Sequence, residues 1–393
     1  MEASTEASPD ITALSSDLPS RSKLQLPASC DPPQPDGPRK ELVWIVFGGT
    51  GHMGRSVVKT ALAHGDKVTT VGKRFETSPE VMMDQPRNCL GALCDVRARE
   101  SVAQVIQNTL DHFGRIDVIA NCSGYGVIGA CEDQDEYEIR NQFETNFMGA
   151  VHIIQESLPY FRQQNGGRYL IFSSPAGALG VPGLGPFCAT KYAVEGLIEA
   201  MLYETDPFNV KATLVEPGLV RRDDNDTNTE DNPLPSWGHF LITQTSEPYS
   251  TNTSPALHAK RMFQWLGDKQ PTSAIKCAEL IWQLAHCSYP PLRLLLGSYA
   301  IESIRDRLRS VTEELEDWKH LNYPLAPDCG LLEQEIRDSE VFGKDTLRPV
   351  SKEDSHDHDH DHDHDNDNSH DHYNSNTNTA NNGIDNNDID MAD

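Results

Sequence analysis

The chain contains 393 residues with a formal net charge of −27, and its nine cysteines include no C-x-x-C pair. Such an acidic chain is a poor partner for nucleic acids and anionic membranes. The sequence also has no run of 18 apolar residues, which a membrane-spanning helix would need. Because the acidic N-terminus also lacks the apolar core of a signal peptide, we expect a soluble protein in the reducing cytoplasm.

The chain begins with residues 1–40, which are rich in Ser, Pro and Asp and show no apolar periodicity. The amino-acid composition changes again near residue 345, after which Asp, His, Asn and Ser predominate. Neither end contains enough apolar surface to repay the entropy lost on ordering. We therefore predict disordered segments at 1–40 and 345–393 around one folded domain at 41–325.

Within that domain, predicted strands alternate with predicted helices. The first strand is apolar throughout, as is typical of a strand covered on both faces. The strands are expected at 42–47, 67–72, 92–94, 116–120, 168–172 and 211–215, and the helices at 54–64, 99–113, 138–161, 186–203, 273–287 and 299–319. This order predicts an α/β fold with a doubly wound parallel sheet, the Rossmann fold.

Two later segments do not follow this alternation. Residues 222–256 are polar with little periodicity, so we expect a substrate loop or lid there and no strand. From His356 to His364 the tail alternates His and Asp. Imidazoles bind zinc, nickel or copper, but a disordered tail has no preformed geometry. We therefore assign no metal ligands and interpret it as a solvated tail, with a metal-buffering or regulatory role as the alternative.

A glycine-rich turn lies between the first strand and the first helix. Glycines here permit a tight turn and a close backbone approach to a pyrophosphate at the helix N-terminus. In this context we interpret the turn as a dinucleotide-binding loop, with an ordinary glycine turn as the alternative. Its candidate binding residues are Gly48, Thr50, Gly51, Met53 and Gly54.

The end of the second strand bears on the choice of cofactor. Sites for NAD usually carry an acidic residue there, which binds the ribose 2′-hydroxyl. In this chain Lys73 and Arg74 occupy that place, and two cations favour the 2′-phosphate of NADP. A solvated basic pair is the alternative. Asp66 precedes the strand, so it lies at the end opposite to the one where an acid would bind the ribose.

Further motifs follow in a fixed order downstream. With the glycine turn, they resemble the short-chain dehydrogenase/reductase family over residues 42–320. The motifs are Asp95-Val96, Asn121-Cys122-Ser123-Gly124, Asn146, Ser174, Phe187 with Lys191, and Pro217-Gly218. The chain departs from the family's pattern in two smaller ways. The turn has the G-x-x-G-x-x-G spacing of extended or atypical members, and Arg222 lies near the position where many members have a threonine.

The resemblance implies a role for each matching residue. Asp95 would contact adenine, Lys191 would hold the nicotinamide ribose, and Ser174 would orient the substrate oxygen. Asn146 would hold a water used in proton relay. Further cofactor contacts are implied for Val96, Asn121, Pro217 and Gly218. The family also implies a small carbonyl or alcohol substrate and a homodimer or homotetramer.

Phe187 stands where this family has its catalytic tyrosine, thirteen positions after Ser174. A phenol four residues before a lysine shares a helix face with it, and the ammonium lowers the phenol pKa. Phenylalanine keeps the ring but has no proton to exchange. Among possible replacements we favour Lys191 with Ser174 over Tyr125 or Tyr192.

Two functions therefore remain open from the sequence. One is an NADP-dependent oxidoreductase with an altered proton donor, which we favour. The other is a catalytically inactive NADP(H)-binding protein that senses the cofactor or serves as a partner subunit. The identity of the substrate has no readable signature in the sequence.

Overall fold

A computed structural model describes residues 24–34, 37, 40–221, 236–237, 239–266 and 271–321. The predicted tail at 345–393, with its His/Asp run, and Arg222 lie outside these residues. Within the described ranges, no helix has the length and apolarity needed to cross a lipid bilayer.

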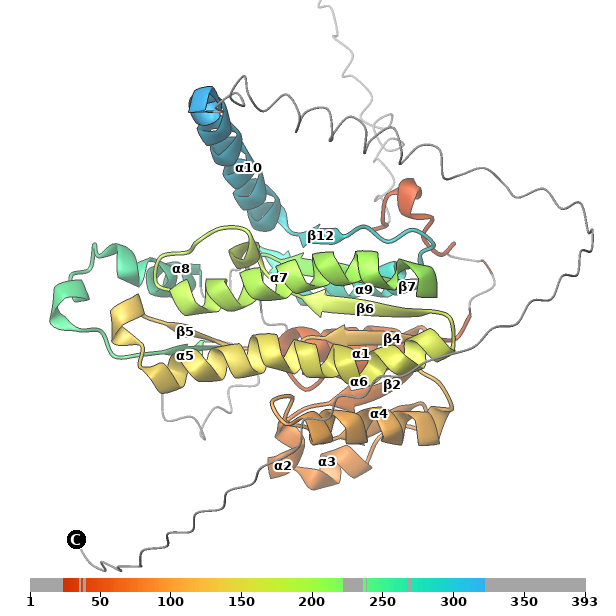
Figure 1. Ribbon diagram of the computed structural model, residues 1–393. Coiled ribbons are helices and arrows are strands. Elements are labelled where there is room, and N and C mark those ends of the chain that lie inside the picture. Colours follow the sequence, from red (N-terminus) through yellow and green to blue (C-terminus); the bar gives the residue numbers. More distant parts are fainter. Residues whose placement is uncertain are drawn as a thin grey trace, which may run out of the picture. The chain divides into compact units, whose positions relative to one another are not determined.

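Seven parallel strands of the described chain form the central sheet, in the order β12-β7-β6-β4-β1-β2-β3 (Figure 1). They are β1 (Val43–Phe47), β2 (Lys67–Val71), β3 (Cys89–Ala92), β4 (Val118–Asn121), β6 (Gly167–Phe172), β7 (Val210–Pro217) and β12 (Arg293–Leu296). The strand order reverses beside β1, which pairs with β2 on one side and β4 on the other. The predicted doubly wound α/β fold is therefore confirmed, and ligands of such sheets bind at the reversal.

Helices cover both faces of this sheet (Figure 1). One apolar layer joins the strands to α4, α6 and α7, and the other joins them to α1 and α9. These helices are α1 (His52–Ala63), α4 (Arg99–Phe113), α6 (Gly149–Gln163), α7 (Gly185–Thr205) and α9 (Ala274–His286). All five residues of β1 are buried, which explains its unbroken apolar sequence.

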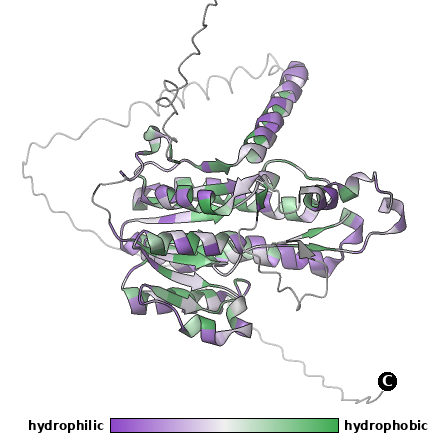
Figure 2. Ribbon diagram, turned by 180° about the vertical axis from the view of Figure 1, so that it is seen from behind, coloured by the Kyte–Doolittle hydropathy of each residue, from purple (hydrophilic) through white to green (hydrophobic). Residues whose placement is uncertain are grey.

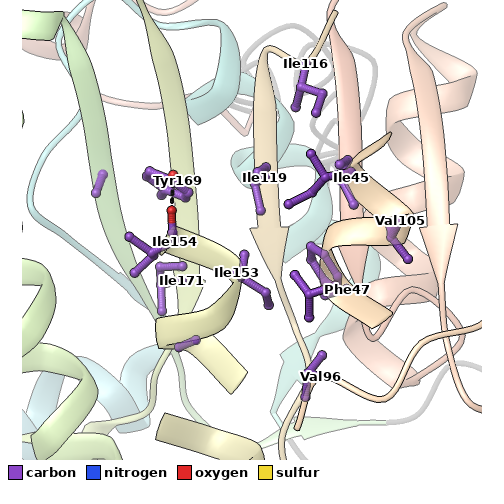
Figure 3. Packing of buried hydrophobic residues seen from close by; sticks show 14 of the residues in the cluster. Ile45, Phe47, Val96, Val105, Ile116, Ile119, Ile153, Ile154, Tyr169 and Ile171 are labelled. Carbon is purple, nitrogen blue, oxygen red and sulfur yellow. Dashed lines mark hydrogen bonds between the residues drawn. The ribbon is translucent and has the colours of Figure 1, made fainter. Parts of the chain in front are cut away.

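The first of these layers contains mostly branched and aromatic side chains (Figure 3). Figure 3 shows Ile45 and Phe47 of β1 near Ile119 of β4, with Tyr169 of β6 beside the α6 side chains. The Tyr169 hydroxyl shares a 2.7 Å hydrogen bond with Ser157 Oγ, so its polar end is satisfied inside the core. In Figure 2 the central strands are mostly green, as expected for buried strands.

The third strand begins three residues earlier than predicted, at Cys89 and not at 92. Gly91 within it weakens the sequence signal, because glycine is uncommon in strands. A Cβ at Gly91 would lie 2.4 Å from the carbonyl oxygen of Met82 in α3 (Pro79–Met83), so this close approach requires glycine. The short helix α2 (Arg74–Thr77) precedes α3.

The helix predicted at 138–161 consists of three consecutive parts. The first part, α5 (Glu136–Phe143), begins with a capping box formed by Asp135 and Glu138. A π-helical turn at Glu144–Met148 follows and leads directly into α6. Such turns widen a helix locally and often occur at functional sites.

The expectation that 222–256 contains no strand is wrong in the described part of that segment. Strand β10 (Phe240–Ile242) pairs with β5 (Gly126–Ile128) and with β9 (Ser236–Trp237). These strands are too short to show a period of two, and β5 is more than a hundred residues away in sequence. The helix α8 (His258–Leu266) follows, and β8 (Val220–Arg221) pairs with β11 (Thr272–Ser273).

Part of the N-terminal segment 1–40, predicted to be disordered, packs on the domain. Leu26 and Cys30 are buried in the layer that contains α1 and α9. The side chain of Gln283 in α9 accepts a 3.0 Å hydrogen bond from Leu26 N and donates one of 2.9 Å to Leu24 O. Leu26, Cys30 and the matched amide of Gln283 therefore join residues 24–34 to the domain.

Candidate active site

A cavity of about 990 Å³ lies at the carboxyl ends of the strands, where the strand order reverses. Twelve of the predicted site residues line it. They are Gly48, Thr50, Gly51, Met53, Gly54, Lys73, Val96, Ser174, Phe187, Lys191, Pro217 and Gly218. Asp95, Asn121 and Asn146 lie behind this wall, in contact with residues that form it. Arg74 begins α2, and its side chain lies outside the described part of the structure.

The glycine turn brings three chain segments very close together. A Cβ at Gly48 would lie 2.7 Å from Ser123 N, and one at Gly54 would lie 2.1 Å from the carbonyl oxygen of Gly48. Gly48 also has a φ of 74°, which glycine adopts without strain. Helix α1 starts after Gly51 with no side-chain cap, so its first N–H groups suit an anionic group such as a pyrophosphate.

Beside the turn, Asp95 is held between two cations. Arg97 Nε lies 3.0 Å from both Asp95 carboxylate oxygens, and Lys73 Nζ lies 3.5 Å from Oδ2. The hydrogen bonds from Arg97 chiefly lower the pKa of Asp95, to about 2. Arg97, which also lines the cavity, was missed from the sequence because no motif includes it.

Asn121 and Asn146 organise the loop after β4. Asn121 Oδ1 accepts hydrogen bonds from the Ser123 backbone N–H, at 3.1 Å, and from the Ser123 hydroxyl. Asn146, in the π-helical turn, accepts from Tyr125 N at 3.0 Å and donates to Tyr125 O at 2.8 Å. It also donates to Thr190 Oγ1 of α7 at 3.0 Å. Its side chain therefore joins α7, the π-helical turn and the loop.

Lys191 lines the cavity and is almost fully buried. Its Nζ donates a 3.0 Å hydrogen bond to the carbonyl oxygen of Phe172 and lies 5.5 Å from the centroid of the Phe187 ring. Burial lowers the pKa of Lys191 to about 8, and the charge of Glu195 only partly opposes that shift. The ammonium is consequently a stronger acid than that of an ordinary lysine.

Phe187 is packed within an apolar wall. Its ring is 3% exposed and meets Phe240 edge to face, with the ring centroids 5.2 Å apart. His239 lies 6.3 Å away, measured between ring centroids, and also lines the cavity. Tyr125 lines the cavity as well, whereas Tyr192 is 45% exposed and does not.

Sequence reasoning did not identify the wall that faces Phe187. It is formed by His239, Phe240, Leu241, Met262 and Phe263. The segment at 222–256 was predicted to be a substrate loop or lid, and His239, Phe240 and Leu241 within it line the cavity. Helix α8 beyond it was not singled out. Tyr299 was also missed. These residues come from segments without a motif, so only their packing in three dimensions identifies them.

Ser174 follows β6, and its Oγ accepts a 3.3 Å hydrogen bond from Ala176 N. The preceding Ser173 donates to Glu195 Oε1 at 2.6 Å. Arg293 binds Glu195 and Glu216 together behind the two serines. The pKa of Glu216 is raised to about 7, mainly by its burial. This buried cluster, absent from the sequence reasoning, supports the strand end that carries Ser174.

A family model described as short chain dehydrogenase matches residues 42–233 of the chain. The chain belongs to the short-chain dehydrogenase/reductase family. Oxidoreductase BOA17 of Botryotinia fuckeliana is 28% identical over 283 residues, which cover 71% of this chain and 97% of that protein. A 3-ketodihydrosphingosine reductase of Bacteroides thetaiotaomicron is 40% identical over 124 residues, which cover 32% of this chain and 46% of the relative.

Solved structures of the family share the fold. The crystal structure of a short-chain dehydrogenase from Streptomyces avermitilis has a TM-score of 0.62 at 29% identity, covering 71% of this chain and 98% of that one. A short-chain dehydrogenase/reductase from Burkholderia phymatum, solved in complex with NAD, has a TM-score of 0.54 at 20% identity. That alignment covers 73% of this chain and 98% of the other.

Proposed function

We propose that this protein is an NADP-dependent oxidoreductase that interconverts a carbonyl and an alcohol, with Lys191 acting as the acid in place of the missing tyrosine. The observation that carries the proposal is the buried ammonium of Lys191, 5.5 Å from the Phe187 ring in the wall of the family's cavity. Asn146, Ser174 and Lys191 are all retained around the one absent hydroxyl.

The dinucleotide would bind along the glycine turn. Its pyrophosphate would lie on the uncapped N-terminus of α1, and Lys73 with Arg74 would favour a 2′-phosphate on the adenosine ribose. Lys73 lines the cavity with a side chain that is 60% exposed, so its ammonium can reach such a group. When bound, the nicotinamide would supply or accept the hydride.

Proton transfer would then depend on the chain's own groups. Ser174 Oγ accepts only the N–H of Ala176 among the described residues, so its proton is available to orient a substrate oxygen. Lys191 would deliver its proton through a water, because its ammonium is bound to Phe172 O and lies 5.5 Å from the centroid of the Phe187 ring. A pKa of about 8 suits an acid that works near neutral pH.

The lining of the cavity favours a bulky apolar substrate. Beyond Ser174, the wall is apolar and aromatic, with Leu184, Phe187, Phe240, Met262 and Phe263. Such a wall binds hydrocarbon, and a carbonyl would face the fewer polar groups of the lining, which include Ser174 and His239. One relative is named a 3-ketodihydrosphingosine reductase, and that name agrees with an apolar ketone as substrate.

A second candidate function has its own support. Phe187 is 3% exposed and is packed edge to face against Phe240. A binding protein that holds NADP(H) without turnover, as a sensor or partner subunit, would tolerate this packing. It would also keep the glycine turn and Lys73, which have no role in proton transfer.

The deciding experiment compares the native protein with Phe187→Tyr. Both are assayed with NADPH and with NADH against a panel of apolar ketones and aldehydes, while cofactor binding is measured by fluorescence. We expect slow turnover with NADPH by the native protein, and an increase in kcat of about 10²–10⁴ in the variant, the usual contribution of a positioned acid.

The matched control is Phe208→Tyr, which adds the same hydroxyl to a partly buried ring that does not line the cavity and should leave kcat within about threefold of native. If the native protein binds NADPH but never turns over, whereas Phe187→Tyr does, the binding-protein alternative is correct. Equal turnover with NADH would contradict the NADP assignment.

A further inference from the structure

The C-terminal helix of the described chain, α10 (Ser298–Trp318), extends beyond the sheet. It follows β12, and Figure 1 shows it leaving the strands at an angle. Ala300 is its one buried residue, and Tyr299 beside it lines the cavity. From Ile301 to the end of the helix, every described side chain is partly or fully exposed. The helix is therefore anchored by its first turn and otherwise surrounded by solvent.

Apolar side chains form one stripe along this exposed length. They recur at alternating spacings of three and four residues, as Ile301, Ile304, Leu308, Val311, Leu315 and Trp318. Leu308, Leu315 and Trp318 are each more than 60% exposed. Figure 2 shows hydrophobic residues at intervals along this otherwise hydrophilic helix. A 3.5-residue repeat over three heptads is the pattern of a two-helix coiled coil, and such a stripe is stable once a second helix covers it.

The charges of α10 are distributed against its own dipole. The first half carries Arg305, Arg307 and Arg309 with Glu302 and Asp306, which pair with Arg305 and Arg309, so its net charge is +1. The second half carries four acidic side chains and no basic one, namely Glu313, Glu314, Glu316 and Asp317. A helix N-terminus favours acidic side chains and a C-terminus favours basic ones. This arrangement therefore destabilises an isolated helix, but it makes each half complementary to the opposite half of another copy.

We propose that α10 pairs with α10 of a second copy of this chain as an antiparallel two-helix coiled coil. In this alignment Leu308 packs against Val311 of the second copy, and Ile304 packs against Leu315. Arg307, which forms no ion pair among the described residues, faces Glu314 of the second copy. The twofold symmetry repeats each contact, so the seam contains two such ion pairs.

A parallel pair and a membrane surface fit these features less well. A parallel alignment would place the three arginines of each helix beside one another. Helices that lie on membranes carry Lys and Arg on their polar face, whereas α10 carries six acidic and three basic side chains. Anionic lipid would therefore repel it.

Sedimentation velocity of the full chain over a range of concentrations tests the proposal. Arg307→Glu and Glu314→Arg should each weaken association about tenfold, because each replaces two attractive pairs with two repulsive ones. The double variant should restore the native association constant to within about twofold. This rescue is specific to an antiparallel seam, because residues 307 and 314 face each other only in that alignment.

Matched controls place the same charge changes off the seam. Arg309→Glu and Glu313→Arg should alter the association constant by less than about twofold. Circular dichroism establishes that each variant keeps its helices. If neither the two charge reversals nor Leu308→Glu with Leu315→Glu changes the mass of the native protein, the proposal is wrong. It is also wrong if the double variant fails to recover, or if α10 instead drives binding to phosphatidylcholine–phosphatidylserine vesicles.

Discussion

Lys191 illustrates how one side chain depends on what surrounds it. Burial lowers its pKa to about 8, and its ammonium lies 5.5 Å from the centroid of the Phe187 ring. In a protein with a tyrosine at 187, this ammonium would chiefly stabilise a phenolate. With Phe187 there is no phenol to stabilise, so the missing hydroxyl changes the role expected of Lys191.

This role has a pH signature. Below about pH 8 the Lys191 ammonium is protonated and can donate, and above that pH it is increasingly neutral. We therefore expect kcat for carbonyl reduction by the native protein to fall about tenfold per pH unit above pH 8, if proton donation limits the rate. The measurement is log kcat between pH 6 and 10 with saturating cofactor and ketone.

The Phe187→Tyr variant serves as the comparison for this profile. Its phenol would become the donor, so its rate should not follow the ionisation of Lys191 in the same way. A native profile that stays flat to pH 9.5 would exclude Lys191 as the rate-limiting acid.

The π-helical turn between α5 and α6 shows how an element positions the site. Asn146 in this turn makes three hydrogen bonds, two to Tyr125 and one to Thr190. Replacing it with alanine would leave the Tyr125 N–H and C=O without these partners in a partly buried place. The loop after β4 should then loosen, and kcat should fall together with stability.

We expect Asn146→Ala to lower the free energy of unfolding by about 1–3 kcal/mol, the cost of leaving buried polar groups unsatisfied. Urea unfolding measures this change. Asn141→Ala is the control, because Asn141 accepts one exposed hydrogen bond from Arg97. If the two variants lose equal stability, the bonds of Asn146 do not hold the loop.

At the level of elements, the central strands and covering helices could be predicted because their apolar patterns are long. The short strands β5, β9 and β10 could not, since their pairing is set by contacts between distant segments. In the site, residues within motifs were identified because spacing alone marks them. The sequence did not identify three residues of the site, because only burial and contacts between distant segments bring them there. They are Arg97, Glu216 and Phe263.

For the whole molecule, Asp66 joins the start of the sheet to a helix far along the chain. Its carboxylate accepts hydrogen bonds from Leu42 N and Trp44 Nε1 near β1, each of 3.0 Å. It also accepts from Trp282 Nε1 at 3.0 Å and His286 Nε2 at 2.9 Å, both in α9. Asp66, which precedes β2 and so lies away from the expected ribose site, thus has a structural role: it connects β1 to α9.

Asp66→Ala should therefore destabilise the whole domain. It leaves several buried N–H donors without an acceptor, and we expect a loss of roughly 3–5 kcal/mol in the free energy of unfolding. Chemical denaturation followed by tryptophan fluorescence measures it. Asp111→Ala, on an exposed face of α4, should cost less than about 0.5 kcal/mol. A loss below 1 kcal/mol for Asp66→Ala would show that Asp66 does not hold the two elements together.

The packing of Leu26 and Cys30 against α9 has a practical consequence for where the folding unit starts. A protein trimmed at the change in composition near residue 40 would uncover the apolar side of α9 that these residues protect. It would also leave the Gln283 side chain without its two backbone partners. The smallest piece of this chain suited to crystallisation or screening therefore begins at or before Leu24, even though the signature motifs all lie after β1.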